Sequence, residues 1–191
     1  MRLKPELFLH ISRYMPSGQA FTHDLFGSWA TAHVPLGWGD LPEPDRYLPY
    51  FSRGPDPYSV GVNCFAQDVL ECEGGGAMFG FANPPLVLAR AAVAFVKESC
   101  SRAVFVLSPP SGVAPPWWTE MVTGPRLIWE CPLPEMNSEY RTSAGVWVDV
   151  VESRRVPLTA YLLDFREFEL GVFSSPSYSP PNTPVPDTDS E

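Results

Sequence analysis

The stretch MFGFANPPLVLARAAVAF, from Met78 to Phe95, joins an apolar run to an asparagine, two prolines and an alanine-rich segment. Ala77–Ala82 is short and apolar, as a buried strand is. Pro84 and Pro85 end this strand, because proline has no N–H with which to continue a sheet ladder. Leu86–Cys100 carries apolar residues on nearly every face and several alanines, so it is predicted to be a mostly buried helix.

A second buried strand follows this helix. Arg102–Leu107 (RAVFVL) is a continuous apolar run of the kind found inside parallel sheets. Strand, helix and strand at this spacing form a βαβ unit, whose crossover is expected to be right-handed. The sequence therefore predicts an α/β fold with a mostly parallel sheet.

Further elements are expected on both sides of this unit. They are a short amphipathic helix at Lys4–Tyr14, a short strand within Phe21–Phe26, a long proline-rich loop at Val34–Asp56, a short helix at Pro115–Val122, a strand at Arg126–Glu130, and an antiparallel terminal pair made by Val146–Val151 and Leu158–Phe165. Residues 1–170 are thus predicted to form one domain. Residues 171–191 are rich in proline, serine and acidic side chains and are predicted to be a disordered tail.

The composition limits the classes of function. The chain has 191 residues, of which 45% are hydrophobic, and a formal net charge of -9. A chain of this length most simply forms one domain with a real hydrophobic core. The negative charge argues against a surface that grips bare phosphate backbone, since that affinity rests on clustered lysines and arginines.

Membrane and metal functions are not expected. No apolar run reaches the roughly 18 residues of a membrane span, and the first residues lack the features of a signal peptide, so we expect an intracellular protein, cytoplasmic or nuclear, that is not secreted. His10, His23 and His33 have no ligand spacing and are expected to have surface or capping roles. No C-x-x-C pair is present, which favours reduced structural thiols over zinc ligands or disulfides at Cys64, Cys72, Cys100 and Cys131.

Asn83 is the candidate for chemistry in the opening stretch. In open α/β sheets, ligands bind outside the carboxyl ends of the strands, where the strand order reverses, and Asn83 is expected at such an end. The rigid prolines behind it would fix the direction of its carboxamide. That carboxamide oxygen and a proline carbonyl together can accept the two hydrogens of an exocyclic amine. The alternative is a strand-ending turn without a ligand.

These residues resemble the [D/N/S]-P-P-[Y/F/W] motif of the S-adenosylmethionine-dependent amino methyltransferases. More particularly, the stretch from Phe21 to Trp129 resembles phage-type DNA adenine methyltransferases and the related Dam-like domains of some tyrosine-recombinase retroelements. The matching pieces stand in the same order: HDLFGS (His23–Ser28), VNCFAQDV (Val62–Val69), FANPPL (Phe81–Leu86), a following helix, AVFVLSPP (Ala103–Pro110) and PWW (Pro116–Trp118).

The resemblance implies a Rossmann-like methyltransferase core with a mostly parallel sheet and an antiparallel C-terminal strand pair. It also implies S-adenosylmethionine as the cofactor and adenine in DNA as the substrate. By position, it places Asp24, Phe26 and Asp68 near the cofactor. For Asp24, a helix or turn cap is the competing interpretation.

The resemblance implies that Asn83, Pro84 and Pro85 hold the target amine. Leu86 stands where the family has an aromatic residue that stacks on the target base. Two further candidates for contact with the base are Trp117 and Trp118, for which packing in the core is the alternative.

A non-enzymatic function is also open. A degenerate methyltransferase fold could act as a binding or structural module in a larger assembly. In that case the acidic tail at 171–191 is a candidate docking segment for a protein partner, although such an end is usually a solvated terminus.

Overall fold

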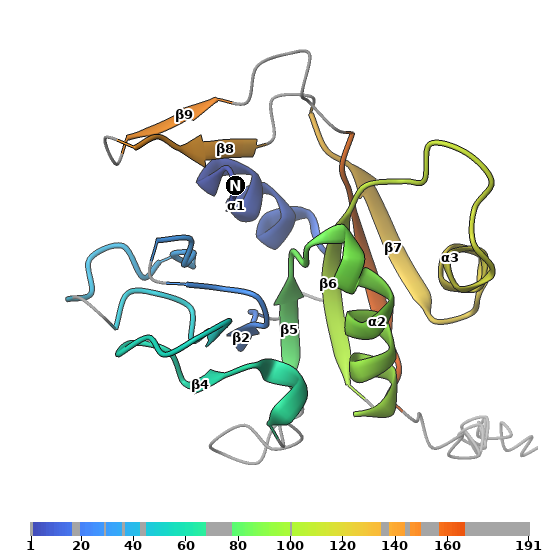
Figure 1. Ribbon diagram of the computed structural model, residues 1–191, viewed down its shortest axis with the longest axis horizontal. Coiled ribbons are helices and arrows are strands. Elements are labelled where there is room, and N and C mark those ends of the chain that lie inside the picture. The colour runs from blue at the N-terminus through green and yellow to red at the C-terminus, as the bar shows by residue number, and fades with distance from the viewer. Residues whose placement is uncertain are drawn as a thin grey trace, which may run out of the picture.

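The computed structural model describes residues 2–16, 20–28, 30–35, 37–42, 45–67, 78–99, 101–134, 138–143, 146–149 and 157–166. These residues form a mixed α/β structure around a central sheet of five strands (Figure 1). Asp68, Cys72, Cys100 and the predicted tail lie outside the described residues.

The central sheet is mostly parallel. Its strands β2, β5 and β6 pair in parallel, whereas β10 is antiparallel to both β6 and β7, so that four of the five strands run in the same direction. The spatial order is β2 (His23–Asp24), β5 (Phe79–Ala82), β6 (Arg102–Leu107), β10 (Thr159–Asp164) and β7 (Leu127–Pro132). The structure thus confirms the strands predicted near positions 21, 77, 102 and 126.

A second strand pair extends the sheet beyond β2. The strand β3 (Phe51–Ser52) pairs in parallel with β4 (Gly61–Val62), and a single parallel bridge from Asp24 to Tyr50 joins this pair to β2. The chain therefore starts in the middle of the sheet at β2, builds outward to β4, and returns to β5 on the other side of β2. The strand order reverses between β2 and β5.

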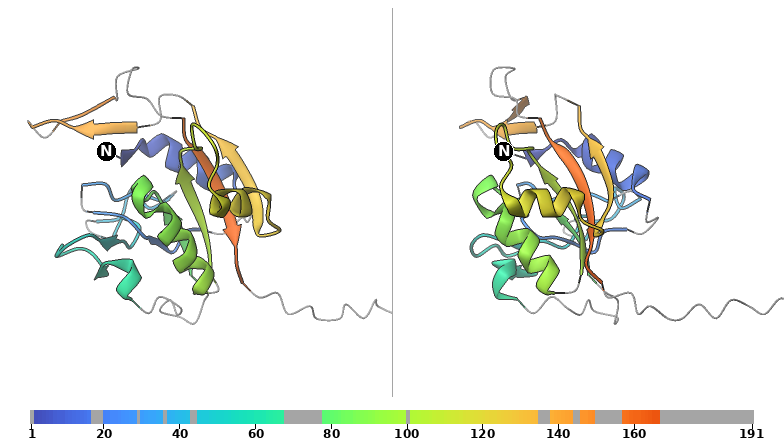
Figure 2. Two further views of the ribbon diagram at one scale, coloured as in Figure 1. Left: turned by 45° about the vertical axis from the view of Figure 1, so that its right-hand side comes forward. Right: turned by 90° about the vertical axis from the view of Figure 1, so that its right-hand side faces the viewer.

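Alternating side chains on the strands build two cores, one on each face of the sheet. Helix α1 (Pro5–Tyr14) covers one face, and helices α2 (Ala89–Glu98) and α3 (Pro116–Thr123) cover the other, as the right-hand view of Figure 2 shows. The α1 face receives Phe79, Phe81, Val104, Val106, Ala160 and Leu162. The α2 face receives Ala82, Ala103, Phe105, Leu107, Tyr161 and Leu163.

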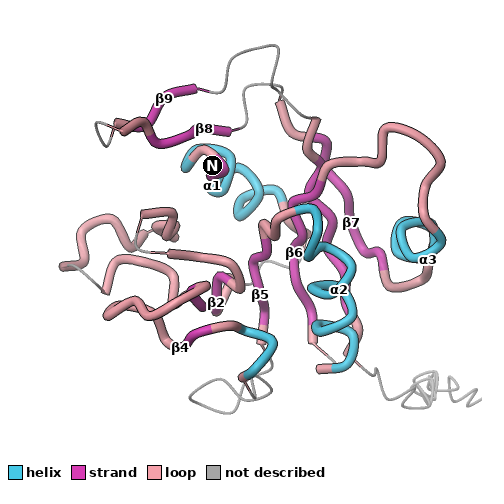
Figure 3. The backbone as a smooth tube through the Cα atoms, viewed as in Figure 1, coloured by secondary structure: helices cyan, strands magenta, loops and turns pink. Residues whose placement is uncertain are grey.

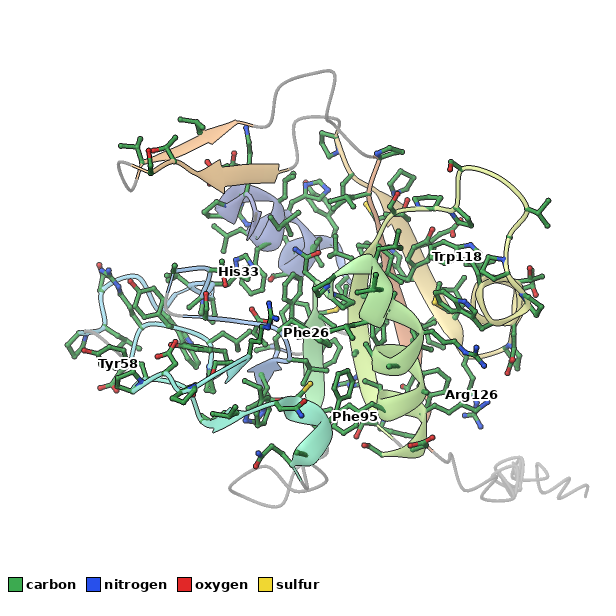
Figure 4. The ribbon with its side chains drawn as sticks, viewed as in Figure 1. Phe26, His33, Tyr58, Phe95, Trp118 and Arg126 are labelled. Carbon is green, nitrogen blue, oxygen red and sulfur yellow. The ribbon has the colours of Figure 1, made fainter. Side chains whose placement is uncertain are left out.

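An aromatic cluster on the α1 face contains a histidine. His33 is 5% exposed and stacks on Phe8 of α1 with 4.4 Å between the ring centroids, and the edge of Phe81 approaches it at 5.1 Å. Figure 4 shows His33 beside α1. The predicted surface or capping role is therefore wrong for His33, because the loop after β2 folds back onto the apolar face of the sheet.

The predicted antiparallel C-terminal pair is also wrong in its partners. Strand β9 (Trp147–Asp149) pairs with β8 (Ser138–Arg141), and β8 pairs with β1 (Arg2–Leu3) in a separate sheet. Strand β10 lies instead between β6 and β7. All six of its residues are buried, and a strand buried on both faces belongs inside a sheet.

The helix predicted at 86–100 is less buried than expected. It begins as a 3₁₀ turn, Leu86–Leu88, and continues as α2, of which Ala89, Ala92 and Val96 are buried. The turn projects beyond the sheet, because Leu86 is 68% and Val87 is 89% exposed. The other helices match the predicted ones to within a residue or two, and the loop predicted at 34–56 contains β3 but is otherwise irregular where it is described (Figure 3).

We predict that Phe81→Ala lowers the free energy of unfolding by about 3–5 kcal/mol, the usual cost of deleting a buried phenylalanine. Phe81 is 0% exposed and its ring meets Phe8, Phe21 and His33. Denaturant unfolding followed by fluorescence measures the change. Val113→Ala is the control, because Val113 is fully exposed, and it is expected to stay within about 0.5 kcal/mol of the unaltered chain.

Candidate functional site

The reversal of strand order brings two predicted site residues together. Asp24 ends β2 and stands in register with Phe81, and the N–H of Leu25 donates to the carbonyl of Phe81 at 2.8 Å. Asn83 follows Phe81 by two residues on the neighbouring strand. Asp24 and Asn83 therefore flank the position at which an open α/β sheet binds its ligands.

The asparagine is held by a rigid backbone. Ala82 before it and Pro84 after it are buried, whereas Pro85 is exposed. The carbonyl of Pro85 accepts the N–H of Leu88 at 2.8 Å, which fixes the exposed turn. Asn83 itself is half-buried, so the residue is partly accessible to a ligand. This exposure is what the amine-binding hypothesis requires.

Asp24 is buried without a cation. Its Oδ1 accepts the N–H of Phe26 at 2.9 Å, and only 3% of the residue is exposed. Burial raises the pKa of Asp24 to about 7, although the hydrogen bond from Phe26 opposes the shift. Among the described residues, no lysine, arginine or histidine forms an ion pair with it. Asp24 does cap a turn, as the competing interpretation predicts, and this role is compatible with a ligand contact.

Cys64 is a neighbour of Asp24 that the sequence did not single out. The thiol is buried, and burial together with the nearby Asp24 charge raises its pKa to about 11, so it is neutral at physiological pH. Asn63, which precedes it, has a φ of 58° and sets the direction of the chain after β4. Only the folded chain brings Cys64 next to β2, because some forty residues separate them.

Phe26 begins a row of half-buried rings on the α2 side of the sheet. Its centroid lies 5.8 Å from that of Phe65, and Phe65 lies 5.6 Å from Phe95 of α2. Figure 4 labels the two outer members, Phe26 and Phe95. The row forms an apolar wall that starts at the loop after β2.

The single glycine of the HDLFGS loop accommodates a side chain of the protein itself. A Cβ atom on Gly27 would lie 2.5 Å from Cβ of Tyr50, closer than two such atoms can approach. Tyr50 is 2% exposed, and its hydroxyl donates to Oδ2 of Asp56 at 3.0 Å. The space beside Gly27 is therefore filled by Tyr50, which sequence reasoning missed because the approach arises only from tertiary packing.

The two adjacent tryptophans differ in exposure. Trp118 is 6% exposed and packs edge-on against Tyr161 of β10 at 5.6 Å, so it belongs to the core, and its contact with a base stays a prediction. Its indole fills the gap between α3 and the sheet, as the packing alternative predicts. Trp117 is half-buried beside it, and its contact with a substrate stays a prediction.

Metal and membrane functions find no support in the described part of the chain. No group of three or more histidine, cysteine, aspartate or glutamate residues there is placed to hold a metal ion. None of the described helices has the length and apolar character needed to span a membrane. Asp68, predicted to lie near the cofactor, falls outside the described residues.

We predict that Asp24→Asn changes how stability depends on pH. The folded pKa of Asp24, about 7, is above the ordinary value of 3.8, so the folded protein holds its proton more tightly than the unfolded chain does. The stabilisation is complete below about pH 4 and is lost as the pH rises through 7. Relative to the unaltered chain, the free energy of unfolding of Asp24→Asn should therefore rise by up to about 4 kcal/mol between pH 4 and pH 8. Denaturant unfolding at each pH measures this difference.

Asp164→Asn is the control with the opposite sign. Burial by itself would raise the pKa of Asp164, but hydrogen bonds from Arg166 outweigh it and lower the pKa. Its stabilising contribution is present at neutral pH and lost as the pH falls, so Asp164→Asn should destabilise most at neutral pH. Equal pH profiles for the two variants would contradict the assignment of Asp24 as an unpaired buried carboxyl.

No protein-family model matches the chain, and no curated protein matches it significantly. The assignment of a function therefore rests on the strand order and on the residues at the carboxyl edge of the sheet.

Proposed function

We propose that the chain is an S-adenosylmethionine-dependent amino methyltransferase-like protein with a Rossmann-like core, acting on adenine in DNA. The strand order supports this core. Doubly wound sheets have the order 3-2-1-4-5-6. The spatial order of the extended sheet is β4-β3-β2-β5-β6-β10-β7. With β2 counted as strand 1 and β10 as strand 7 in chain order, this order reads 3-2-1-4-5-7-6, and strand 7 is antiparallel to its neighbours. The sheet thus equals the doubly wound one with a single strand inserted.

The half-buried Asn83 at the switch point is the observation that carries the proposal. Its carboxamide oxygen and the carbonyl of Pro84 are the acceptors that would hold the two hydrogens of an exocyclic amine, which turns the nitrogen lone pair outward. S-adenosylmethionine would supply an already activated methyl group, and Asn83 and Pro84 would orient the amine nitrogen toward it, with one proton of the amine passing to solvent. Orientation is the main requirement, because the sulfonium is already activated.

Asp24 and Phe26 supply the complementary cofactor contacts in this proposal. A buried carboxyl suits a cationic group, and the half-buried ring of Phe26 suits an apolar or adenine surface. Asp24 is the last residue of β2 and Phe26 lies two residues after it, while Asn83 follows the neighbouring strand β5. Asp68 stays a prediction for the adenosine part.

A non-enzymatic binding module is the second candidate, and two observations favour it. Tyr50 fills the space beside Gly27 that a cofactor would otherwise approach. Leu86, in place of the family's aromatic residue, is 68% exposed and offers no ring to a base. A fold that has lost cofactor binding would keep the sheet and the proline corner for contact with another molecule.

We predict that the protein binds S-adenosylmethionine and transfers its methyl group to DNA. Asn83→Ala should lower the rate of transfer at least 100-fold and leave the cofactor affinity within about threefold, because Asn83 is proposed to contact the amine and not the cofactor. Calorimetric titration gives the affinity. Transfer of a labelled methyl group to single- and double-stranded DNA gives the rate.

Glu120→Gln is the matched control for this experiment. Glu120 pairs with Lys97 in an exposed salt bridge on the surface of α3, so its loss should change neither quantity. Absence of cofactor binding at millimolar concentration would exclude the enzyme and favour the binding module. Equal rates for Asn83→Ala and the unaltered protein would remove Asn83 from the active site.

We also predict that Leu86→Phe increases the affinity for single-stranded DNA roughly tenfold, since stacking of a base on an aromatic ring is worth about 1–3 kcal/mol. The exposed position should tolerate the ring, with the free energy of unfolding changed by less than about 0.5 kcal/mol. Val87→Phe, at the neighbouring exposed position, is the control. An equal gain from both variants would mean that the effect is not specific to the position next to the NPP motif.

A further inference from the structure

We propose that Asp24 gives up one proton when a positively charged group of the ligand binds beside it, so that ligand binding is coupled to pH. This inference rests on the proposed function, because it takes the ligand to be S-adenosylmethionine or a relative of it. It concerns the coupling between charge and binding, which the proposed function does not require.

Two buried aspartates, Asp164 and Asp24, differ in whether a cation pairs with them. Asp164 is 6% exposed, and Arg166 donates three hydrogen bonds to its carboxylate, one from the backbone N–H at 3.1 Å and two from the guanidinium at 2.9 Å and 2.5 Å. Asp24 is 3% exposed, and in the described structure its carboxyl has one backbone hydrogen bond and no cation. Burying a carboxylate without a cation is costly. Asp164, at one end of the strands, thus has a cationic partner, whereas Asp24, at the switch point at the other end, has none among the described residues.

The groups around Asp24 do not supply the missing charge. On β5 it faces Gly80 and Phe81, and on the other side Tyr50 meets it through a backbone bridge. Cys64 is a neighbouring titratable side chain, and its raised pKa keeps it neutral. The preceding residue, His23, is half-buried against Phe51, and burial lowers its pKa, which favours the neutral ring. Among the described residues, none supplies a cation to this carboxyl, which leaves the ligand as the source in this proposal.

The proton balance is simple. In the empty protein the carboxyl is largely protonated below pH 7, in keeping with its pKa of about 7. When the cation binds, the O–H bond breaks, the proton passes to the buffer, and the carboxylate pairs with the cation. No other bond changes. Affinity for a cationic ligand should then fall about tenfold for each pH unit below 7.

Three ligands separate the possible sources of the positive charge. S-adenosylmethionine carries a sulfonium and an ammonium group, S-adenosylhomocysteine carries the ammonium group only, and 5′-methylthioadenosine carries neither. The full chain is titrated with each at pH 6 and pH 8.5 in several buffers of different ionisation enthalpy. The slope of the observed enthalpy against the ionisation enthalpy counts the protons released.

At pH 6 we expect about one proton released by S-adenosylmethionine and none by 5′-methylthioadenosine. The count for S-adenosylhomocysteine then identifies the partner of Asp24: one proton indicates the ammonium group, and none indicates the sulfonium. Asp24→Asn keeps the acceptor for the Phe26 N–H and should release no proton with any ligand. Its affinity for S-adenosylmethionine should lack the tenfold loss for each pH unit below 7 that is expected of the unaltered protein.

The outcomes that overturn the inference differ from those that overturn the proposed function. Binding of S-adenosylmethionine at pH 6 without proton release would refute the coupling and leave the cofactor intact. Equal proton release by the unaltered protein and Asp24→Asn would assign the proton to another group and refute the coupling too. Binding of none of the three ligands at either pH would refute both.

Discussion

The burial of β5, β6 and β10 on both faces is the constraint on which the rest of the structure depends. Every residue of these strands is buried, so the sheet needs cover on each side, and α1 on one face and α2 with α3 on the other provide it. A strand in this environment can bear a functional side chain only beyond its end. The candidate site residues accordingly lie at strand ends: Asp24 is the last residue of β2, and Asn83 follows β5.

The same constraint explains why charge is handled differently at the two ends of the sheet. Arg102 and Asp164 lie at one end, where the guanidinium of Arg102 stands over the ring of Phe79 at 4.1 Å and Arg166 pairs with Asp164. At that end the carboxylate of Asp164 therefore has a cationic partner. At the other end, Asp24 and Asn83 are polar groups whose bonding capacity is not used up by the protein, which is typical of sites that trade stability for binding.

Periodicity in the sequence was sufficient for the central βαβ unit but not for the parts that depend on distant partners. Arg102–Leu107 and the proline stop after Ala82 are local signals, and the structure confirms both. The insertion of β10 between β6 and β7, the burial of His33 and the burial of Trp118 depend on which segments meet in space. Asp24 could be nominated from its motif, but its lack of a cation is visible only in the fold. The roles of Asn83 and Asp24 in catalysis stay predictions.

The tight fit of Tyr50 against Gly27 has a further consequence for the shape of this edge. The side chain of Tyr50 packs against the loop at Gly27, and its hydroxyl donates a hydrogen bond to Asp56 in the proline-rich segment. Opening space next to Gly27 would thus require a smaller residue in place of Tyr50, since Gly27 already has no side chain. Any larger residue in place of Gly27 would instead displace Tyr50 and the proline-rich segment that carries it from the sheet.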